Sequence, residues 1–187
     1  MKMGKSKKRP TGYRILGDFF TDCQKLDPQS FAKEHGNAFF LHHGPIGKLQ
    51  KSLKEDTTLD AISSATIPDK RFVPREDFLI FPVRHGAAGK PGDSIWVGRS
   101  EDNDIVIPDA SVSALHALIK TGKRGKYYLQ DTGSMNGSFV NDNLVPVEGK
   151  GEPVLLESGS RVRFGSVGMT FLMAPEFHTM IIRLLDE

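Results

Sequence analysis

Three short segments, each rich in small and polar residues, carry the side chains of this chain that are best suited to binding. Arg99 follows a glycine, Ser113 lies within Ser111–Ala117, and Asn136 begins an Asn-Gly pair. Together they supply a permanent cation, a hydroxyl and an amide that both donates and accepts hydrogen bonds. Taken singly, each has an ordinary explanation: a surface salt bridge, a turn hydroxyl and a hairpin residue. Their meaning therefore depends on the elements that position them.

The three segments lie in a region whose pattern is typical of short strands separated by turns. From Asp77 onward, hydrophobic residues come in short runs, with glycine, proline or asparagine between them. The expected strands are Phe78–Phe81, Ser94–Val97, Asp104–Ile107, His116–Lys120, Tyr127–Gln130, Phe139–Val140, Val154–Leu156, Val162–Phe164 and Met169–Met173. Many short strands with frequent glycine turns predict a β-sandwich or barrel, in which loops at one end carry the binding groups.

Both flanks of this region have a different pattern. Residues 16–23 place apolar side chains at i, i+3, i+4 and i+7, which predicts a short amphipathic helix. A second helix is expected to begin after Asp27, as its N-cap, and to end at Gly36, and Ala38–Leu41 is a candidate strand. Residues 175–185 predict an amphipathic C-terminal helix, whose apolar stripe is expected to dock on the rest of the fold.

Composition and charge narrow the class of protein. The chain has 187 residues, 38% of them hydrophobic and 26% charged, as in soluble globular proteins, and its net charge is +2. Every charged residue before Asp18 is basic, which predicts a basic, disordered tail; nucleic-acid binding through that tail is a less favoured alternative. The single cysteine, Cys23, excludes an internal disulfide and is expected to be a buried structural thiol. No apolar run reaches the ~18 residues of a membrane span, so a cytoplasmic protein is predicted.

Taken in order, the three segments resemble the signature of the forkhead-associated (FHA) domain. That family combines a Gly-Arg pair, a Ser-x-x-His segment and a Ser-x-Asn-Gly-Thr/Ser turn. The corresponding segments here are Gly98-Arg99, Ser113–His116 and Ser134–Ser138. The resemblance spans roughly residues 77–173. It implies an all-β, FHA-type sandwich of the SMAD/FHA-like class.

The resemblance divides the chain into four parts. Residues 1–12 are the basic disordered tail, residues 13–76 an N-terminal extension and linker of mixed and helical character, residues 77–173 the FHA domain, and residues 174–187 the C-terminal helix. The sequence leaves open whether the extension forms a separate domain or packs on the sandwich.

The resemblance also implies a ligand, a phosphothreonine peptide. Phosphothreonine carries close to two negative charges and three acceptor oxygens. By the family pattern, Arg99 pairs with the phosphate, Ser113 donates its hydroxyl to it, and Asn136 holds the peptide backbone. The residues expected at the edge of the site are Ser100, Ala114, Ser134 and Met135, and those expected to support it without touching phosphate are Gly98, His116 and Gly137.

Two positions depart from the family pattern. Ala114 stands where the family often has Arg, Lys or Asn, and Met135 stands where a small polar residue is common. A hydrogen bond to a charged group contributes about 1.5–3 kcal/mol, so losing one weakens binding roughly tenfold or more. Met135 is expected to offer apolar contact beside the phosphothreonine instead. The alternative function is a degenerate FHA module that mediates phosphate-independent protein–protein interaction.

The polar segment at residues 44–76 contains candidate regulatory phosphosites. Thr57 and Thr66 each begin a Thr-x-x-Asp pattern, and the family's ligands include peptides with Asp at that spacing. The acidic double threonine at Thr57 and Thr58 resembles a segment ahead of the FHA domain in small actinobacterial metabolic regulators, where the phosphorylated tail binds its own domain. Thr57, Thr58 and Thr66 are therefore candidate phosphosites, and the segment is a candidate intramolecular ligand.

These observations predict a non-enzymatic phosphothreonine-peptide-binding adaptor in bacterial serine/threonine kinase signalling. The expected partner is a phosphothreonine-containing protein, such as a Ser/Thr kinase or its substrate. Residues 13–76 contain no nucleophile–base pair, phosphate-binding loop or metal-ligand set, so no enzyme, cofactor or metal site is expected there.

Overall fold

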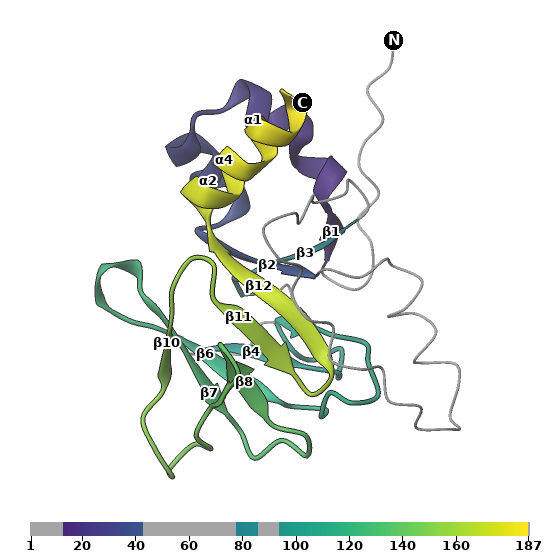
Figure 1. The fold of residues 1–187 in the computed structure, drawn as a ribbon, viewed down its shortest axis with the longest axis vertical. Helices are drawn as coiled ribbons and strands as arrows, with labels where there is room; N and C mark the ends of the chain where they lie inside the picture. The colour runs from purple at the N-terminus through teal and green to yellow at the C-terminus, as the bar shows by residue number, and fades with distance from the viewer. Residues whose placement is uncertain (1–12, 43–77, 86–93, 187) are drawn as a thin grey trace.

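The computed structural model describes residues 13–42, 78–85 and 94–186, and these form a β-sandwich with a layer of helices on one side (Figure 1). One sheet has seven strands in the order β1-β3-β2-β12-β11-β8-β9, and the other has five in the order β10-β7-β6-β4-β5. Nearly all neighbouring strands are antiparallel, and only β4 and β5 pair in parallel. The predicted all-β sandwich is thus confirmed.

The strands follow the predicted runs closely. Those of the larger sheet are β1 (Arg14–Ile15), β2 (Ala38–His42), β3 (Leu79–Pro82), β8 (Ser138–Val140), β9 (Asn143–Leu144), β11 (Arg161–Phe164) and β12 (Val167–Met173). Those of the smaller sheet are β4 (Ser94–Gly98), β5 (Ile105–Val106), β6 (Ala117–Thr121), β7 (Tyr127–Asp131) and β10 (Val154–Leu156). The two-residue strands β1 and β9 were not predicted, because two residues are too few to show an alternating pattern.

The helices are close to those that the sequence predicts. A 3₁₀ turn, Leu16–Phe19, leads directly into α1 (Phe20–Lys25). Helix α2 (Pro28–His35) is capped by the Asp27 carboxylate, which accepts hydrogen bonds from the backbone N–H groups of Gln29 and Ser30, and it ends at Gly36 with φ +109°. Helix α4 (Ala174–Leu185) closes the chain. The sequence of residues 49–62 is also a candidate for a helix, and this segment lies outside the described residues.

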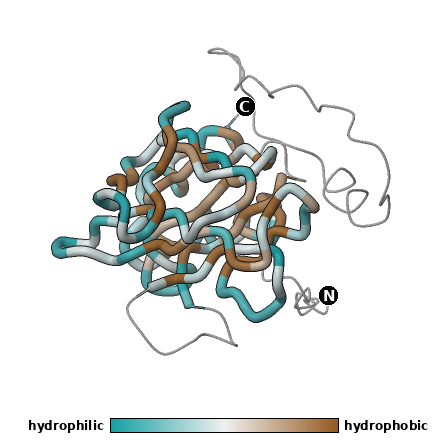
Figure 2. Tube along the Cα trace, turned by 90° about the horizontal axis from the view of Figure 1, so that it is seen from below, coloured by the Kyte–Doolittle hydropathy of each residue, from teal (hydrophilic) through white to brown (hydrophobic). Residues whose placement is uncertain are grey.

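Two hydrophobic cores explain why β2 and β3 are apolar without alternation. In β2, Phe40 packs in the core between the sheets, whereas Phe39 faces the helices. In β3, Phe81 and Ile80 divide between the two cores in the same way. A strand that is buried on both faces has no polar side, so its sequence is a continuous apolar run. Figure 2 shows hydrophobic segments through the body of the fold and hydrophilic loops at its margin.

The helical layer packs α1 and α2 against α4, which lies more than a hundred residues later in the chain. Phe177 of α4 is fully buried and stacks on Phe39, with 4.4 Å between ring centroids, and Phe19 and Phe31 complete the aromatic cluster. The prediction that the C-terminal helix docks on the fold is confirmed by this packing. Cys23 is also buried here, as expected, and burial raises the pKa of its thiol to about 12, so it is no reactive thiolate.

The strand pairing of β2 indicates where the folded unit begins. This strand lies inside the larger sheet, paired with β12 on one side and β3 on the other. Residues 13–42 therefore pack as part of the sandwich, whereas residues 43–76 of the expected extension lie outside the described residues. We propose that the folded unit comprises residues 13–42 together with residues 78–186, and that the boundary expected at residue 77 falls inside it.

Candidate functional site

The three polar segments meet at one end of the sandwich, where strands of both sheets end. Arg99 follows β4 in the smaller sheet, Ser113 lies between β5 and β6, and Asn136 lies in the loop that crosses from β7 to β8. Their meeting point is the stretch Ser111–Ser113. The Arg99 N–H donates to the Ser113 carbonyl (2.9 Å), and the Asn136 Nδ2 donates to the Ser111 carbonyl (2.8 Å). The predicted trio is thus brought onto one surface.

Arg99 is held by backbone and not by an opposite charge. Its Nε donates to the carbonyl of Val112 at 3.2 Å, which fixes the direction of the guanidinium. The side chain is exposed, and in the described part of the chain no carboxylate forms an ion pair with it. The terminal nitrogens of the guanidinium are therefore available to an anion from outside the protein.

Ser113 has its hydroxyl directed by the neighbouring loop. The Met135 N–H donates to Ser113 Oγ at 3.1 Å, so this oxygen acts as an acceptor within the protein. Its proton remains to be donated outward. An anion beside Ser113 would therefore receive a hydroxyl donor whose position is already fixed.

His116 links the loop that carries Ser113 to the loop between β7 and β8, from inside the fold. Its ring is fully buried; Nδ1 accepts from the Ser113 N–H (3.0 Å), and Nε2 lies 3.2 Å from the Gly137 carbonyl. Because the carbonyl only accepts, Nε2 carries the proton. Burial lowers the pKa of His116 below its ordinary value, which keeps the ring in this neutral form.

Gly98 and Asn103 close the first loop onto the second. A Cβ at Gly98 would collide with the Ala114 carbonyl oxygen, so no other residue fits there without movement of the backbone. Asn103 is buried, and its Nδ2 donates to the carbonyls of Ser100 (2.8 Å) and Ala114 (2.7 Å). Asn103 was not predicted as a supporting residue, because a buried amide that bridges two loops leaves no distinctive pattern in one sequence.

Asp131 is a second supporting residue that was not predicted from the sequence. It is 1% exposed and accepts hydrogen bonds from the Gly133 and Ser134 N–H groups and from the Ser134 and Ser138 hydroxyls, at 2.6–2.8 Å. Burial alone would raise the pKa of Asp131, but these hydrogen bonds outweigh it and leave that pKa below its ordinary value. The Asp-x-Gly-Ser order, typical of a side-chain-capped turn, was the available signal.

The remaining residues expected at the edge of the site divide into two groups. The hydroxyls of Ser134 and Ser100 donate to Asp131 (2.7 Å) and Asp102 (3.3 Å) respectively, so both already have partners. Ala114 and Met135 are exposed, and Met135 is 89% exposed. The site therefore offers fewer free donors than its sequence suggests. Its uncommitted side-chain groups include the terminal nitrogens of Arg99, the proton of the Ser113 hydroxyl and the side-chain oxygen of Asn136.

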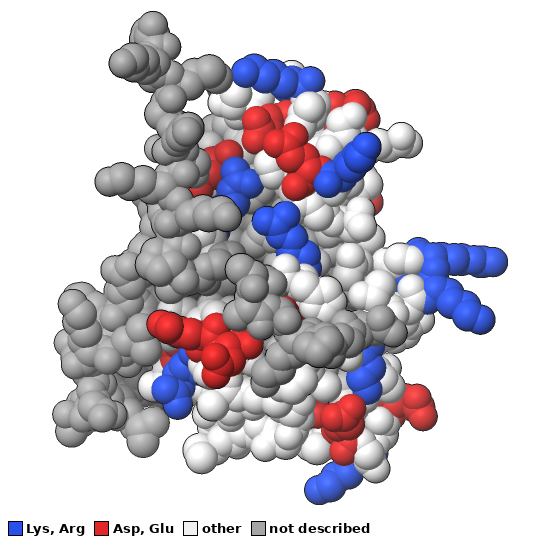
Figure 3. All heavy atoms as spheres, turned by 180° about the vertical axis from the view of Figure 1, so that it is seen from behind, with Lys and Arg blue, Asp and Glu red and all other residues white. Residues whose placement is uncertain are grey.

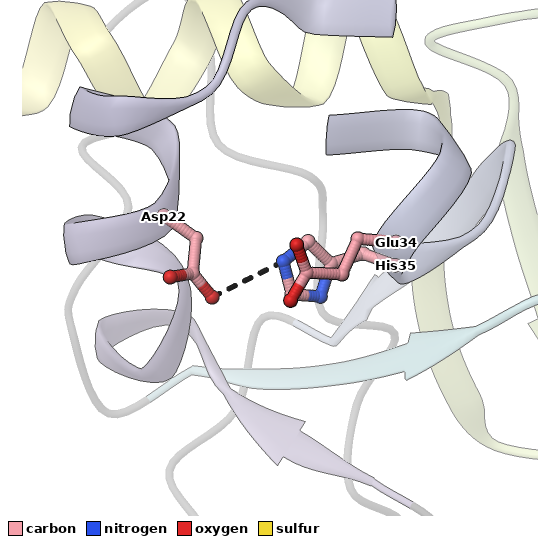
Figure 4. Close-up of side chains that lie close together, drawn as sticks. All are labelled: Asp22, Glu34 and His35. Atoms are coloured by element: carbon pink, nitrogen blue, oxygen red, sulfur yellow. Dashed lines mark ion pairs between the residues drawn. The ribbon is translucent and has the colours of Figure 1, made fainter. Parts of the chain in front are cut away.

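A second group of titratable side chains lies between α1 and α2, far from these loops in the sequence (Figure 4). Ligand atoms of Asp22, Glu34 and His35 all lie within 4.8 Å of one another. However, Arg14 Nη1 lies 3.0 Å from His35 Nδ1, and a guanidinium can only donate, so the proton of the neutral ring is on Nε2. Nε2 faces Asp22 at 3.2 Å. A metal ion there would have to displace that proton or Arg14, so we interpret the cluster as structural.

On the face that Figure 3 shows, the described basic and acidic side chains are interspersed and form no extended basic area. Nucleic-acid backbones are bound by clustered Lys and Arg, so this face lacks that feature. Within residues 13–42, 78–85 and 94–186, no helix is long and apolar enough to cross a membrane.

Comparison with known proteins places residues 95–165 under the model of the FHA domain family. The chain is 34% identical over 79 residues to the glycogen accumulation regulator GarA of Mycolicibacterium smegmatis, which covers 42% of the chain and 46% of GarA. It is 35% identical over 81 residues to an ABC transporter ATP-binding/permease protein of Mycobacterium tuberculosis, which covers 43% of the chain and 9% of that protein. The chain thus spans less than half the length of these curated relatives.

Among solved structures, the FHA domain of an Arabidopsis thaliana hypothetical protein is 33% identical. The match covers 54% of this chain and 77% of that domain, with a TM-score of 0.40.

Proposed function

We propose that the protein binds phosphothreonine-containing peptides through Arg99, Ser113 and Asn136, because residues 95–165 match the model of the FHA domain family. The observation that carries this proposal is the free guanidinium of Arg99 beside the outward hydroxyl of Ser113. A phosphate dianion needs a cation and neutral donors together, and charge-assisted hydrogen bonds of this kind are the strong ones. Asn136 lies at the edge of the same surface, where its Nδ2 donates to the Ser111 carbonyl, which leaves its side-chain oxygen to accept a hydrogen bond from the backbone of the peptide.

The protein acts by reversible binding and not by catalysis. Its partner is a phosphothreonine-containing protein, either a serine/threonine kinase or a kinase substrate, and it works in the cytoplasm of a bacterial cell. GarA, which shares the domain, is named as a regulator. Among the described residues, the buried thiol of Cys23 and the neutral ring of His116 are both committed to structure, which agrees with a role in binding.

A second candidate function is phosphate-independent protein–protein interaction through the same loops. Its support is that Ser100 and Ser134 donate to Asp102 and Asp131, and that Ala114 carries no donor. Because the two serine hydroxyls already have partners and the Ala114 side chain has no donor, fewer hydrogen bonds to phosphate can form. Phosphate then contributes less of the binding free energy than in a site with all donors free. The two functions differ in whether removing the phosphate removes binding.

The candidate phosphosites Thr57, Thr58 and Thr66 lie outside the described residues. One observation favours the segment as an intramolecular ligand. Strand β2, which precedes the segment in the chain, ends at His42, and His42 Nδ1 donates to the Gly168 carbonyl (2.9 Å), beside the β11–β12 turn. In that turn the Ser166 N–H donates to Ser111 Oγ (2.9 Å), within the candidate site. Phosphosite mapping of protein from its native cell tests this; a complete absence of phosphate at all three threonines contradicts it.

Calorimetric titration with paired peptides tests the proposed function. Phosphothreonine peptides of a library should bind, and their unmodified counterparts should not. Arg99→Ala should reduce the affinity at least tenfold, because it removes a hydrogen bond to a charged group that contributes about 1.5–3 kcal/mol. Arg183→Ala is the matched control, because Arg183 is an exposed arginine on α4. Equal binding of phosphorylated and unmodified peptides would instead establish the phosphate-independent function.

A further inference from the structure

The sulfur-containing side chains of the described fold differ greatly in their exposure to solvent. Met135 is 89% exposed. The other sulfur-containing residues that the structure describes are buried or half-buried: Cys23, Met169, Met173 and Met180. Met1 and Met3 lie outside the described residues. Met135 is thus the one sulfur in the described part of the chain that a small solute reaches freely.

The side chain of Met135 contributes little to the stability of the fold, although its backbone is fixed. A side chain that is almost fully exposed buries almost no apolar surface, and stabilisation by such residues comes from burial. The Met135 N–H donates to Ser113 Oγ at 3.1 Å, and the side chain of the next residue, Asn136, donates to the Ser111 carbonyl at 2.8 Å. The thioether is therefore held in the open, on an ordered loop of the candidate site.

A methionine thioether reacts directly with small peroxides. A lone pair of the sulfur attacks one oxygen of hydrogen peroxide, an S–O bond forms while the O–O bond breaks, and the second oxygen leaves as water. The sulfur loses two electrons, and these reduce the peroxide. The product is methionine sulfoxide, from which a reductase that takes two electrons from a dithiol removes the oxygen again as water. Because sulfur and oxidant must touch, exposure decides which methionine reacts first.

A sulfoxide at position 135 changes what a bound phosphopeptide meets. The backbone contact of Met135 to Ser113 places it beside the proposed phosphate position. The sulfoxide oxygen only accepts hydrogen bonds, and so do the oxygens of a phosphate dianion, so the two cannot pair. A peptide that covers the sulfoxide removes its oxygen from water without giving it a partner, which costs free energy. Oxidation therefore weakens binding while the fold remains intact.

We propose that Met135 is a reversible oxidation site through which hydrogen peroxide weakens phosphopeptide binding. The inference rests on the proposed function and adds a means of regulating the same site. Cys23 does not take this role, because it is buried and burial raises the pKa of its thiol to about 12. The group that responds is a surface thioether, and the oxidant is a small peroxide.

Peptide mapping by mass spectrometry, after treatment with increasing doses of hydrogen peroxide, tests the site itself. The full chain is used in its folded state. Met135 should gain one oxygen at a lower dose than Met169, Met173 and Met180, since those three are shielded by the fold. Oxidation of Met135 no earlier than that of Met173 or Met180 would overturn the proposal.

The affinity for a phosphothreonine peptide that contains no Met or Cys tests the consequence. It is measured by fluorescence anisotropy before and after the lowest dose that fully oxidises Met135. The oxidised protein should bind about tenfold more weakly, as expected for one acceptor left without a partner, and methionine sulfoxide reductase should restore the affinity.

Two variants show whether the effect comes from Met135. Met135→Leu keeps a similar volume and has no sulfur, so it should have the same affinity before and after peroxide, whatever its starting value. Met180→Leu is the matched control on α4, and it should lose affinity on oxidation as the unaltered protein does. Each protein is compared with itself, so a change in starting affinity does not affect the result.

The outcomes separate the inference from the function on which it rests. Unchanged affinity of the oxidised protein, or an equal loss in Met135→Leu, overturns the regulatory role of Met135 and leaves the proposed function standing. If the untreated protein binds no phosphothreonine peptide, the proposed function fails and the inference fails with it.

Discussion

At the scale of residues, the candidate site is built from groups that are fixed by backbone and from one buried charge. Arg99 is oriented by the Val112 carbonyl, and Ser113 by the N–H of Met135. Neither contact uses the groups that would face a ligand. The loop that carries Asn136 depends instead on Asp131, whose carboxylate accepts four hydrogen bonds. Such preorganisation lowers the entropic cost of ligand binding.

Replacing Asp131 should therefore affect both stability and binding. In Asp131→Asn the side chain keeps its shape but loses its charge, and one of its two oxygens becomes a donor that faces other donors. Because hydrogen bonds to charged groups are the stronger ones, we expect the free energy of unfolding to fall by about 2–4 kcal/mol. Urea unfolding measures this, and Glu148→Gln is the control, because Glu148 is exposed and its carboxylate forms a surface ion pair with Lys120.

Peptide affinity measured on folded Asp131→Asn protein then shows whether Asp131 positions the Asn136 loop in addition to stabilising the fold. If Asp131 positions the Asn136 loop, phosphopeptide affinity should be weaker even at temperatures where the variant is fully folded. Unchanged affinity in the folded variant would mean that Asp131 serves stability alone.

At the scale of elements, the larger sheet is stabilised on both faces, by the smaller sheet and by the helices. This arrangement makes α4 part of the fold although it lies beyond the FHA match at residues 95–165. Phe177 is a central residue of this contact, since it is fully buried and touches Phe19, Phe31 and Phe39. The helices lie over β2, β3 and β12, whereas the candidate loops are at strand ends.

Truncating Phe177 should destabilise the protein without changing its ligand. Phe177→Ala should lower the free energy of unfolding by about 3–5 kcal/mol, the range for large-to-small changes of buried aromatic residues. Thermal or urea unfolding measures the loss, and Glu176→Ala on the exposed side of the same helix should change little. A loss below 1 kcal/mol for Phe177→Ala would show that the helical layer is not part of the cooperative unit.

At the scale of the whole molecule, the sequence was informative where patterns are local or periodic. Apart from the two-residue β9, the strands from Leu79 onward have short-range signals and are confirmed, as are the Asp27 cap of α2 and the amphipathic α4. The convergence of Arg99, Ser113 and Asn136 was inferred only through family resemblance, because three separate loops have no common period.

Other features were beyond a sequence reading for physical reasons. The place of β2 inside the larger sheet depends on long-range pairing with β12, more than a hundred residues later in the chain, and on a second core that buries its other face. The pairing of Phe139 with Leu144 and with Arg163 was not predicted either, because these three residues become neighbours only through the register of three strands.

The central claim is that phosphothreonine is bound at the meeting point of the three loops. Backbone amide shifts, measured by NMR while a phosphothreonine peptide is added, test this most directly. We predict that the largest changes fall in residues 99–103, 111–116 and 132–137, and that the unmodified peptide causes none of them. Changes centred on α1, α2 and α4, or the same changes with the unmodified peptide, would contradict the claim.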